Sequence, residues 1–122
     1  MKYLYTFWGK VRKGKNRGKR LGFPTANINL KKNIPQGVYI SKSKVQGKIY
    51  PSLTFVGRAK TFGETFYHAE TYILNFEKSI YNFWISIKLI KKLRENKKFN
   101  SEKDLVEQMK KDRKKALEFH SS

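Results

Sequence analysis

The strongest constraint on the fold is a series of short runs rich in aromatic and β-branched residues, each bounded by turn-forming residues, which fills the chain to residue 93. Gln46-Gly47 predicts a hairpin turn, and Gly57 is expected to end the strand before it. Short strands with no helix between them favour an antiparallel barrel or sandwich over a parallel sheet with crossover helices. About six strands are expected, over residues 3–12, 25–30, 38–42, 48–56, 66–76 and 81–93.

Beyond residue 100 the pattern changes to the period of an α-helix. Ser101, followed three residues later by Asp104, is a signal for a helix N-terminus. One stripe of the following segment is apolar, and lysines cover the opposite side. We therefore expect a single C-terminal helix packed on the sheet, with the stripe formed by Leu105, Val106, Met109, Ala116 and Phe119.

Composition bounds the class of protein. The chain has 122 residues, of which 39% are hydrophobic, so residues 1–122 should form one folded domain with a modest core. It contains no cysteine, which excludes a disulfide scaffold or a thiolate metal site and fits a reducing compartment. It has neither a signal-peptide core nor an apolar run of about 18 residues. We expect a cytoplasmic protein with no membrane partner.

The net charge of +19 is unevenly distributed, because fifteen Lys and Arg residues and no acidic residue precede Glu64. Such a cationic half attracts nucleic acid, nucleotides or anionic membranes, and charge alone does not choose among them. Part of the surplus also fits an ordinary solvated surface. A nucleic-acid-binding barrel would expose aromatic side chains on a basic groove. Here Tyr, Phe and Trp alternate as core residues would, so we expect no nucleic acid partner.

Few residues can carry chemistry. The only histidines are His68 and His120, the latter in a tail expected to fray, which disfavours a catalytic triad or a histidine-rich zinc site. Glu70 shares the more apolar face of its strand with Tyr72 and Leu74. Apolar surroundings disfavour the ionised carboxylate and suit a general base. An ion pair with a Lys or Arg is the alternative, and both remain open.

Two neighbouring segments suggest anion and metal binding. The basic, glycine-spaced loop 13–20 could cradle phosphates, although it matches neither common nucleotide-binding motif and a loop without ligand is the alternative. In the segment Gly22-Phe23-Pro24-Thr25-Ala26-Asn27, Thr25 and Asn27 are expected to project from the same side. Their oxygens are acceptable Mg²⁺ ligands when phosphates and waters supply the remaining positions.

The string Leu21-Gly22-Phe23-Pro24-Thr25-Ala26-Asn27 resembles the hallmark of the riboflavin kinase family, which also forms the C-terminal half of bifunctional bacterial FAD synthetases. The resemblance implies a mostly β fold, a six-stranded antiparallel Greek-key β-barrel with a C-terminal α-helix. We expect a monomer, and the sequence itself leaves the oligomeric state open. Met1 lies directly before the first strand, which favours a free-standing kinase. The match continues in register through Gly37-Val38-Tyr39, Gly57, Thr61-Phe62, Glu70, Phe76, Tyr81, Leu93-Arg94, Lys98-Phe99 and Asp112.

The implied activity is transfer of the γ-phosphoryl group of ATP to the 5′-hydroxyl of riboflavin, with Mg²⁺, giving FMN and ADP. The resemblance makes Glu70 the catalytic base and lets Thr25 and Asn27 contact Mg²⁺ and the nucleotide. It assigns Gly14 and Lys19 to the phosphate loop. It also implies a substrate-binding loop over the flavin with Leu93, Arg94 and Phe99.

The chain departs from the family pattern at several positions. Many relatives have Asn where this chain has Phe55, and Arg-Pro where it has Ala59-Lys60. Asn75 replaces a frequent Asp, and Asn82 replaces a frequent Gly. Because none of these is a proposed metal ligand or the base, activity should survive, whereas flavin contacts and the choice of nucleotide stay open.

Overall fold

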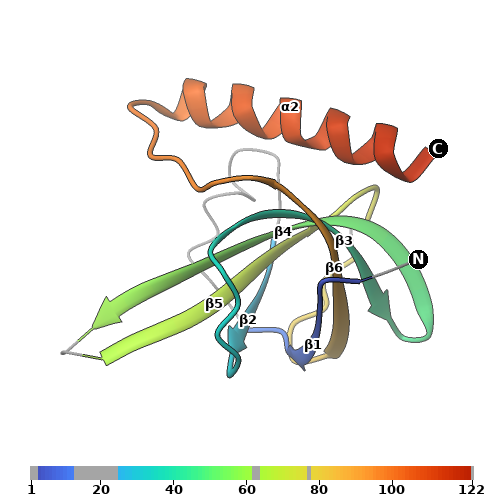
Figure 1. Cartoon of the computed structure of the whole chain (residues 1–122). Coiled ribbons are helices and arrows are strands. Elements are labelled where there is room, and N and C mark those ends of the chain that lie inside the picture. Colours follow the sequence, from blue (N-terminus) through green and yellow to red (C-terminus); the bar gives the residue numbers. More distant parts are fainter. Residues whose placement is uncertain (1–2, 13–24, 62–63, 77, 122) are drawn as a thin grey trace.

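A computed structural model describes residues 3–12, 25–61, 64–76 and 78–121. Its six strands form one antiparallel sheet that curls into a nearly closed barrel, and a long helix lies across the outside (Figure 1). The elements are β1 (Tyr5–Lys10), β2 (Ala26–Leu30), β3 (Gly37–Val45), β4 (Lys48–Thr61), β5 (Glu64–Ile73), β6 (Trp84–Arg94) and α2 (Glu102–Ser121). The predicted barrel with a C-terminal helix is confirmed.

The strands lie in the order β1-β6-β3-β4-β5-β2. Three consecutive strands, β3 to β5, form a meander, and β6 returns beside β3, which is the Greek-key arrangement. The edge strands β1 and β2 approach each other where Arg12 forms a bridge with Asn27. There the backbone N–H of Arg12 donates to the carbonyl oxygen of Asn27 at 2.7 Å.

The sheet buries apolar residues on both faces. The barrel interior is filled by a cluster that includes Phe7, Ile28, Tyr39, Val56 and Ile87. A second cluster lies between the outer face and α2, where Met109 and Ala116 of the helix meet residues of three strands. Where both clusters overlap, strand residues are buried consecutively instead of alternately. The strand side chains of the second cluster are Val38, Ile40, Leu53 and Tyr72, and Leu74 joins it from the turn after β5.

Five buried hydroxyl groups line part of the barrel interior and bond to one another in a chain. Ser52 is the partner of both Ser43, at 2.8 Å, and Ser41, at 2.7 Å. Ser41 also bonds to Thr54 at 2.8 Å, and Thr54 bonds to Thr71 at 3.0 Å. All five residues are fully buried. The chain of bonds links β3, β4 and β5 and provides partners for hydroxyl groups that are otherwise costly to bury.

Replacing Ser52 with Ala should therefore lower the free energy of unfolding by about 1–3 kcal/mol, because it leaves two buried hydroxyl groups without this partner. Ser43→Ala is the matched control, since Ser43 lies at the end of the chain of bonds and its removal affects one neighbour. Urea unfolding measures both. Equal losses in the two variants would show that the chain of bonds adds nothing beyond the individual side chains.

The prediction that Gly57 ends its strand is wrong. β4 runs through Gly57 to Thr61 and pairs with β5 over most of that length, with Gly57 opposite His68. A Cβ atom at position 57 would lie 3.5 Å from Cε1 of the His68 ring, so the glycine sits against that ring without interrupting the ladder. Cross-strand pairing thus outweighs the low strand propensity of glycine here.

The predicted hairpin at Gln46-Gly47 is confirmed, and both residues have positive φ, at 49° and 83°. Two asparagines elsewhere in the chain also adopt the left-handed region, Asn75 with φ 57° and Asn82 with φ 70°. Asn tolerates this region better than most side chains. The two departures from the family pattern therefore fall at turns whose backbone suits Asn.

The helix begins as predicted, with the backbone N–H of Asp104 donating to Oγ of Ser101 at 3.1 Å. The expected fraying is wrong, because α2 continues to Ser121 and the His120 ring packs edge-on against Phe119. Burial, and then the nearby Lys42, lower the pKa of His120. Within the described residues, no helix combines the length and apolar character needed to cross a bilayer.

Candidate functional site

The central pair of the candidate site is Asn27 on β2 and Glu70 on β5. These residues are direct cross-strand partners in the antiparallel ladder, so their side chains leave the sheet side by side on one face. Both are partly exposed. The register therefore places an amide and a carboxylate together, although 42 positions separate them in the chain. The sequence had indicated each residue separately, without this pairing.

Glu70 lies at the margin of the cluster beneath α2. On its other side it is paired with Phe55 of β4, which packs against that cluster. Tyr72, two residues further along the same face, is buried in it. The face chosen from the sequence is thus the outer, helix-facing one, while Ala69 and Ile73 point into the barrel. Apolar groups adjoin Glu70 on one side, and the polar Asn27 adjoins it on the other.

Thr25 lies just before β2 and lines a cavity of about 250 Å³. Its side chain is accompanied there by Thr71, the last hydroxyl in the buried chain of bonds. Asn27 is not among the described residues that line this cavity, and the joint role of Thr25 and Asn27 in holding a metal stays a prediction. The remaining described lining is Val11, Ala26, Ile73, Phe76, Lys78, Ser79, Ile80 and Tyr81.

The predicted phosphate loop, residues 13–20, lies outside the described residues. Its described flanks are Arg12, bonded to the backbone of Asn27, and Thr25, two residues before Asn27. The two residues assigned to that loop, Gly14 and Lys19, lie outside the described residues. The described residues on either side of positions 13–24, Arg12 and Thr25, thus lie near Asn27.

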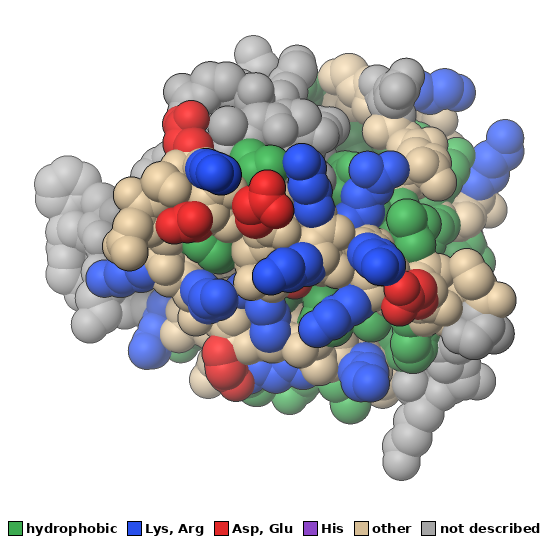
Figure 2. All heavy atoms as spheres, turned by 90° about the horizontal axis from the view of Figure 1, so that it is seen from above, with side chains coloured by type: hydrophobic (Ala, Val, Ile, Leu, Met, Phe, Trp, Pro, Cys, Tyr) green, Lys and Arg blue, Asp and Glu red, His purple; other side chains and the backbone are tan. Residues whose placement is uncertain are grey.

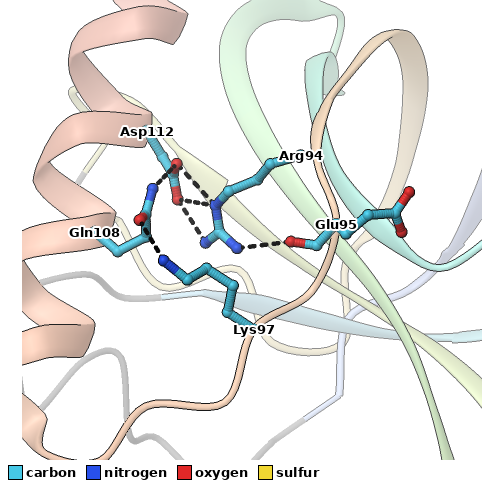
Figure 3. A network of polar contacts seen from close by, with 5 residues as sticks. All are labelled: Arg94, Glu95, Lys97, Gln108 and Asp112. Atoms are coloured by element: carbon cyan, nitrogen blue, oxygen red, sulfur yellow. Dashed lines mark hydrogen bonds and ion pairs between the residues drawn. The ribbon is translucent and has the colours of Figure 1, made fainter.

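The predicted flavin-side residues Leu93 and Arg94 end β6. Leu93 packs against the cluster beneath α2. Arg94 forms a bidentate ion pair with Asp112 of the helix, with Nη2 donating to Oδ2 at 2.7 Å and Nε donating to Oδ1 at 3.0 Å (Figure 3). Asp112 is 1% exposed, and Nε2 of Gln108 also donates to it at 3.0 Å. The pair fastens the end of the sheet to the helix.

Residues 95–100 lead from β6 towards α2, and two neighbouring side chains near the start of this segment anchor it. Nδ2 of Asn96 donates to the carbonyl oxygen of Val56, the neighbour of Phe55, at 3.0 Å. Nζ of Lys97 donates to Oε1 of Gln108 at 3.4 Å (Figure 3). The predicted residue Phe99 is half-buried, and Nζ of Lys97 is 5.7 Å from its ring centroid. This connecting segment is thus tied to the strand next to Glu70.

Sequence reasoning had not identified Asn96, Gln108 or the role of Asp112 in this arrangement. A signal for Asp112 was present, because it interrupts the apolar stripe between Met109 and Ala116 on a helix rich in lysine. An acid at such a position needs a buried cation as partner. Asn96 carried no comparable signal, since its partner is a backbone carbonyl.

A family model described as riboflavin kinase matches residues 1–120. The chain belongs to the riboflavin kinase family. The predicted resemblance is confirmed. A bifunctional riboflavin kinase/FMN adenylyltransferase of Bacillus subtilis is 35% identical over 124 residues, which cover 97% of this chain and 39% of that protein. The chain therefore spans well under two thirds of that relative's length.

Two solved structures share this fold, and one of them is of a riboflavin kinase. The riboflavin kinase of Trypanosoma brucei has a TM-score of 0.67 and 25% identity, covering 96% of this chain and 80% of its own. A structure described as a macrolide-efflux protein from Streptococcus pneumoniae has a TM-score of 0.84 and 31% identity, covering 89% and 37%. The barrel and helix are thus shared with proteins of differing length.

The ion pair between Arg94 and Asp112 should be a principal anchor of the helix. Asp112→Asn keeps the size of the side chain but leaves the guanidinium without its charged partner, and should cost about 3 kcal/mol in free energy of unfolding. Arg113→Gln, at an exposed neighbouring position, should change it by less than about 0.5 kcal/mol. Denaturant unfolding compares the two, and similar values would contradict this role.

Proposed function

We propose that this chain transfers the γ-phosphoryl group of ATP to the 5′-hydroxyl of riboflavin, as a monomeric cytoplasmic enzyme. The observation that carries the proposal is the cross-strand pairing of Asn27 with Glu70. This pairing puts Asn27, a candidate ligand of phosphate and metal, beside Glu70, the candidate base. On the far side of Glu70 lies β4, to which Asn96 is bonded. Family membership supports the choice of substrates.

Glu70 accepts the proton of the ribityl 5′-hydroxyl as that oxygen attacks the γ-phosphorus. The new P–O bond forms while the bond from the γ-phosphorus to the bridging oxygen breaks, and ADP leaves with that electron pair. Phosphoryl transfer depends mainly on positioning and neutralisation of charge, so one base and a cationic surround form a sufficient set. Glu70 is partly exposed beside Asn27, so a substrate hydroxyl can reach its carboxylate.

The nucleotide would bind on the side of Thr25 and Asn27. Their hydroxyl and amide oxygens are hard oxygen donors of the kind that Mg²⁺ prefers, which leaves the carboxylate of Glu70 free to act as the base. When bound there with the phosphates, Mg²⁺ would neutralise their negative charge. The basic residues assigned to the loop, with Gly14 and Lys19, would add backbone and side-chain donors to the phosphates. The cavity beside Thr25 offers room for the remainder of the nucleotide.

Riboflavin would bind between Glu70 and residues 95–100. Phe55 on the sheet and Phe99 in the connecting segment offer apolar surface to a flat ring system. The ion pair of Arg94 with Asp112 uses part of the guanidinium, and Nη1 donates to the carbonyl oxygen of Glu95. Arg94 would therefore position this segment in addition to any direct contact with substrate.

Purified protein incubated with riboflavin, ATP and Mg²⁺ should form FMN, which chromatography with fluorescence detection separates from riboflavin. Parallel reactions with CTP determine the donor preference that the sequence leaves open. A reaction without Mg²⁺ should give little product. Absence of FMN with either nucleotide would overturn the proposal.

Glu70→Gln should reduce turnover by about 100-fold or more, because the amide cannot accept the proton. Binding of riboflavin and of ATP with Mg²⁺, measured by calorimetry, should change little. Glu107→Gln on the exposed side of α2 is the control for loss of one carboxylate and should keep its activity. Wild-type turnover in Glu70→Gln would leave Glu70 with a structural role only.

A further inference from the structure

The outer face of the sheet is covered unevenly. α2 covers the region around Ile40 and Leu53, whereas the region where β1 meets the start of β6 remains exposed. Trp8 of β1 and Trp84 of β6 lie there with 68% and 65% of their surfaces exposed. The expectation that the tryptophans alternate into the core is therefore wrong for both. Two such exposed side chains on paired strands form a patch that packing among the described residues does not explain.

The register places the two indoles close to each other. Trp8 is opposite Ser86, and Trp84 is opposite Lys10, so both tryptophans lie on the same face in diagonal positions. Diagonal neighbours are about 7–8 Å apart at the backbone, within reach of aromatic side chains. The row continues across β3 and β4, because Ser86 pairs with Lys44 and Lys44 pairs with Ile49, which is 64% exposed.

Lysines separate the apolar groups on this surface, which we call the indole face. It comprises Trp8, Lys10, Lys44, Ile49, Trp84 and Lys88, and none of its described positions is acidic. Nζ of Lys88 also lies 4.6 Å from the ring centroid of Tyr3, which adds a third aromatic group. Polar or cationic partners thus stand directly beside each indole.

We propose that the indole face binds single-stranded nucleic acid. Bases stack on aromatic side chains regardless of sequence, and lysines between them neutralise the phosphates. A duplex keeps its bases stacked internally and cannot use the indoles in this way. Protein interfaces are depleted in lysine at their centre, and a membrane-inserting surface needs contiguous apolar contact. The alternation of indole and lysine therefore favours exposed bases joined by phosphates, and this revises the expectation of no nucleic acid partner.

The chain contains two tryptophans, and both belong to the indole face, so intrinsic tryptophan fluorescence reports on this surface alone. Single-stranded RNA or DNA 12-mers should quench this fluorescence, and anisotropy of a labelled 12-mer should show binding that weakens with salt. The double variant Trp8→Ala/Trp84→Ala should bind roughly tenfold or more weakly while still forming FMN. Circular dichroism confirms that the variant folds.

The matched control separates stacking from general attraction to a cationic protein. Lys and Arg side chains also spread over the surface seen from the α2 side (Figure 2), and Lys110 and Lys114 are exposed there. Lys110→Gln/Lys114→Gln should weaken binding less than Lys44→Gln/Lys88→Gln, which removes the same charge from the indole face. Equal losses, no quenching, or equal affinity for a duplex would overturn the proposal. Quenching by anionic phosphatidylserine vesicles but not by oligonucleotides would overturn the proposal in favour of a membrane surface. Dimerisation that the tryptophan variant abolishes would overturn it in favour of a second copy of this chain.

Discussion

The sheet is curled and has to be covered on both faces, and the described residues offer one helix for the outer face. Burial and exposure along the strands follow from this constraint. Closing the barrel takes one face of every strand for the interior, and the outer face then needs a second cover. α2 supplies that cover through Met109 and Ala116, but it reaches only part of the surface. Consecutive buried residues in β3 and exposed tryptophans in β1 and β6 follow from the same limited coverage.

The candidate site lies where this coverage ends. Glu70 borders the packed cluster on the side of Phe55 and faces a polar neighbour, Asn27, on the other. A carboxylate at such a boundary has apolar surroundings and still remains partly exposed to a ligand. The ion pair of Arg94 with Asp112 determines where the helix lies, and the bond from Asn96 to Val56 holds residues 95–100 beside the same strand. The contacts of Arg94 and Asn96 that hold the helix and residues 95–100 in place therefore also shape the candidate site.

Local pattern predicted the strands and the helix well, because each depends on neighbouring residues. It misjudged Gly57, where pairing with β5 outweighs propensity, and the tryptophans, whose alternation does not reveal which face is covered. The residues of the site could be nominated from the sequence and from the family resemblance, but the register that pairs Asn27 with Glu70 could not. Register depends on long-range contacts that a single sequence does not display.

The bridge between Arg12 and Asn27 closes the gap between the first and last strands of the sheet order. It lies where the two edge strands of the described sheet meet, so it acts as the seam of the barrel. A ligand held by Asn27 would fasten this seam from outside. Bound and free protein would then differ most in how often β1 and β2 separate, and amide exchange in these two strands would slow when the site is filled.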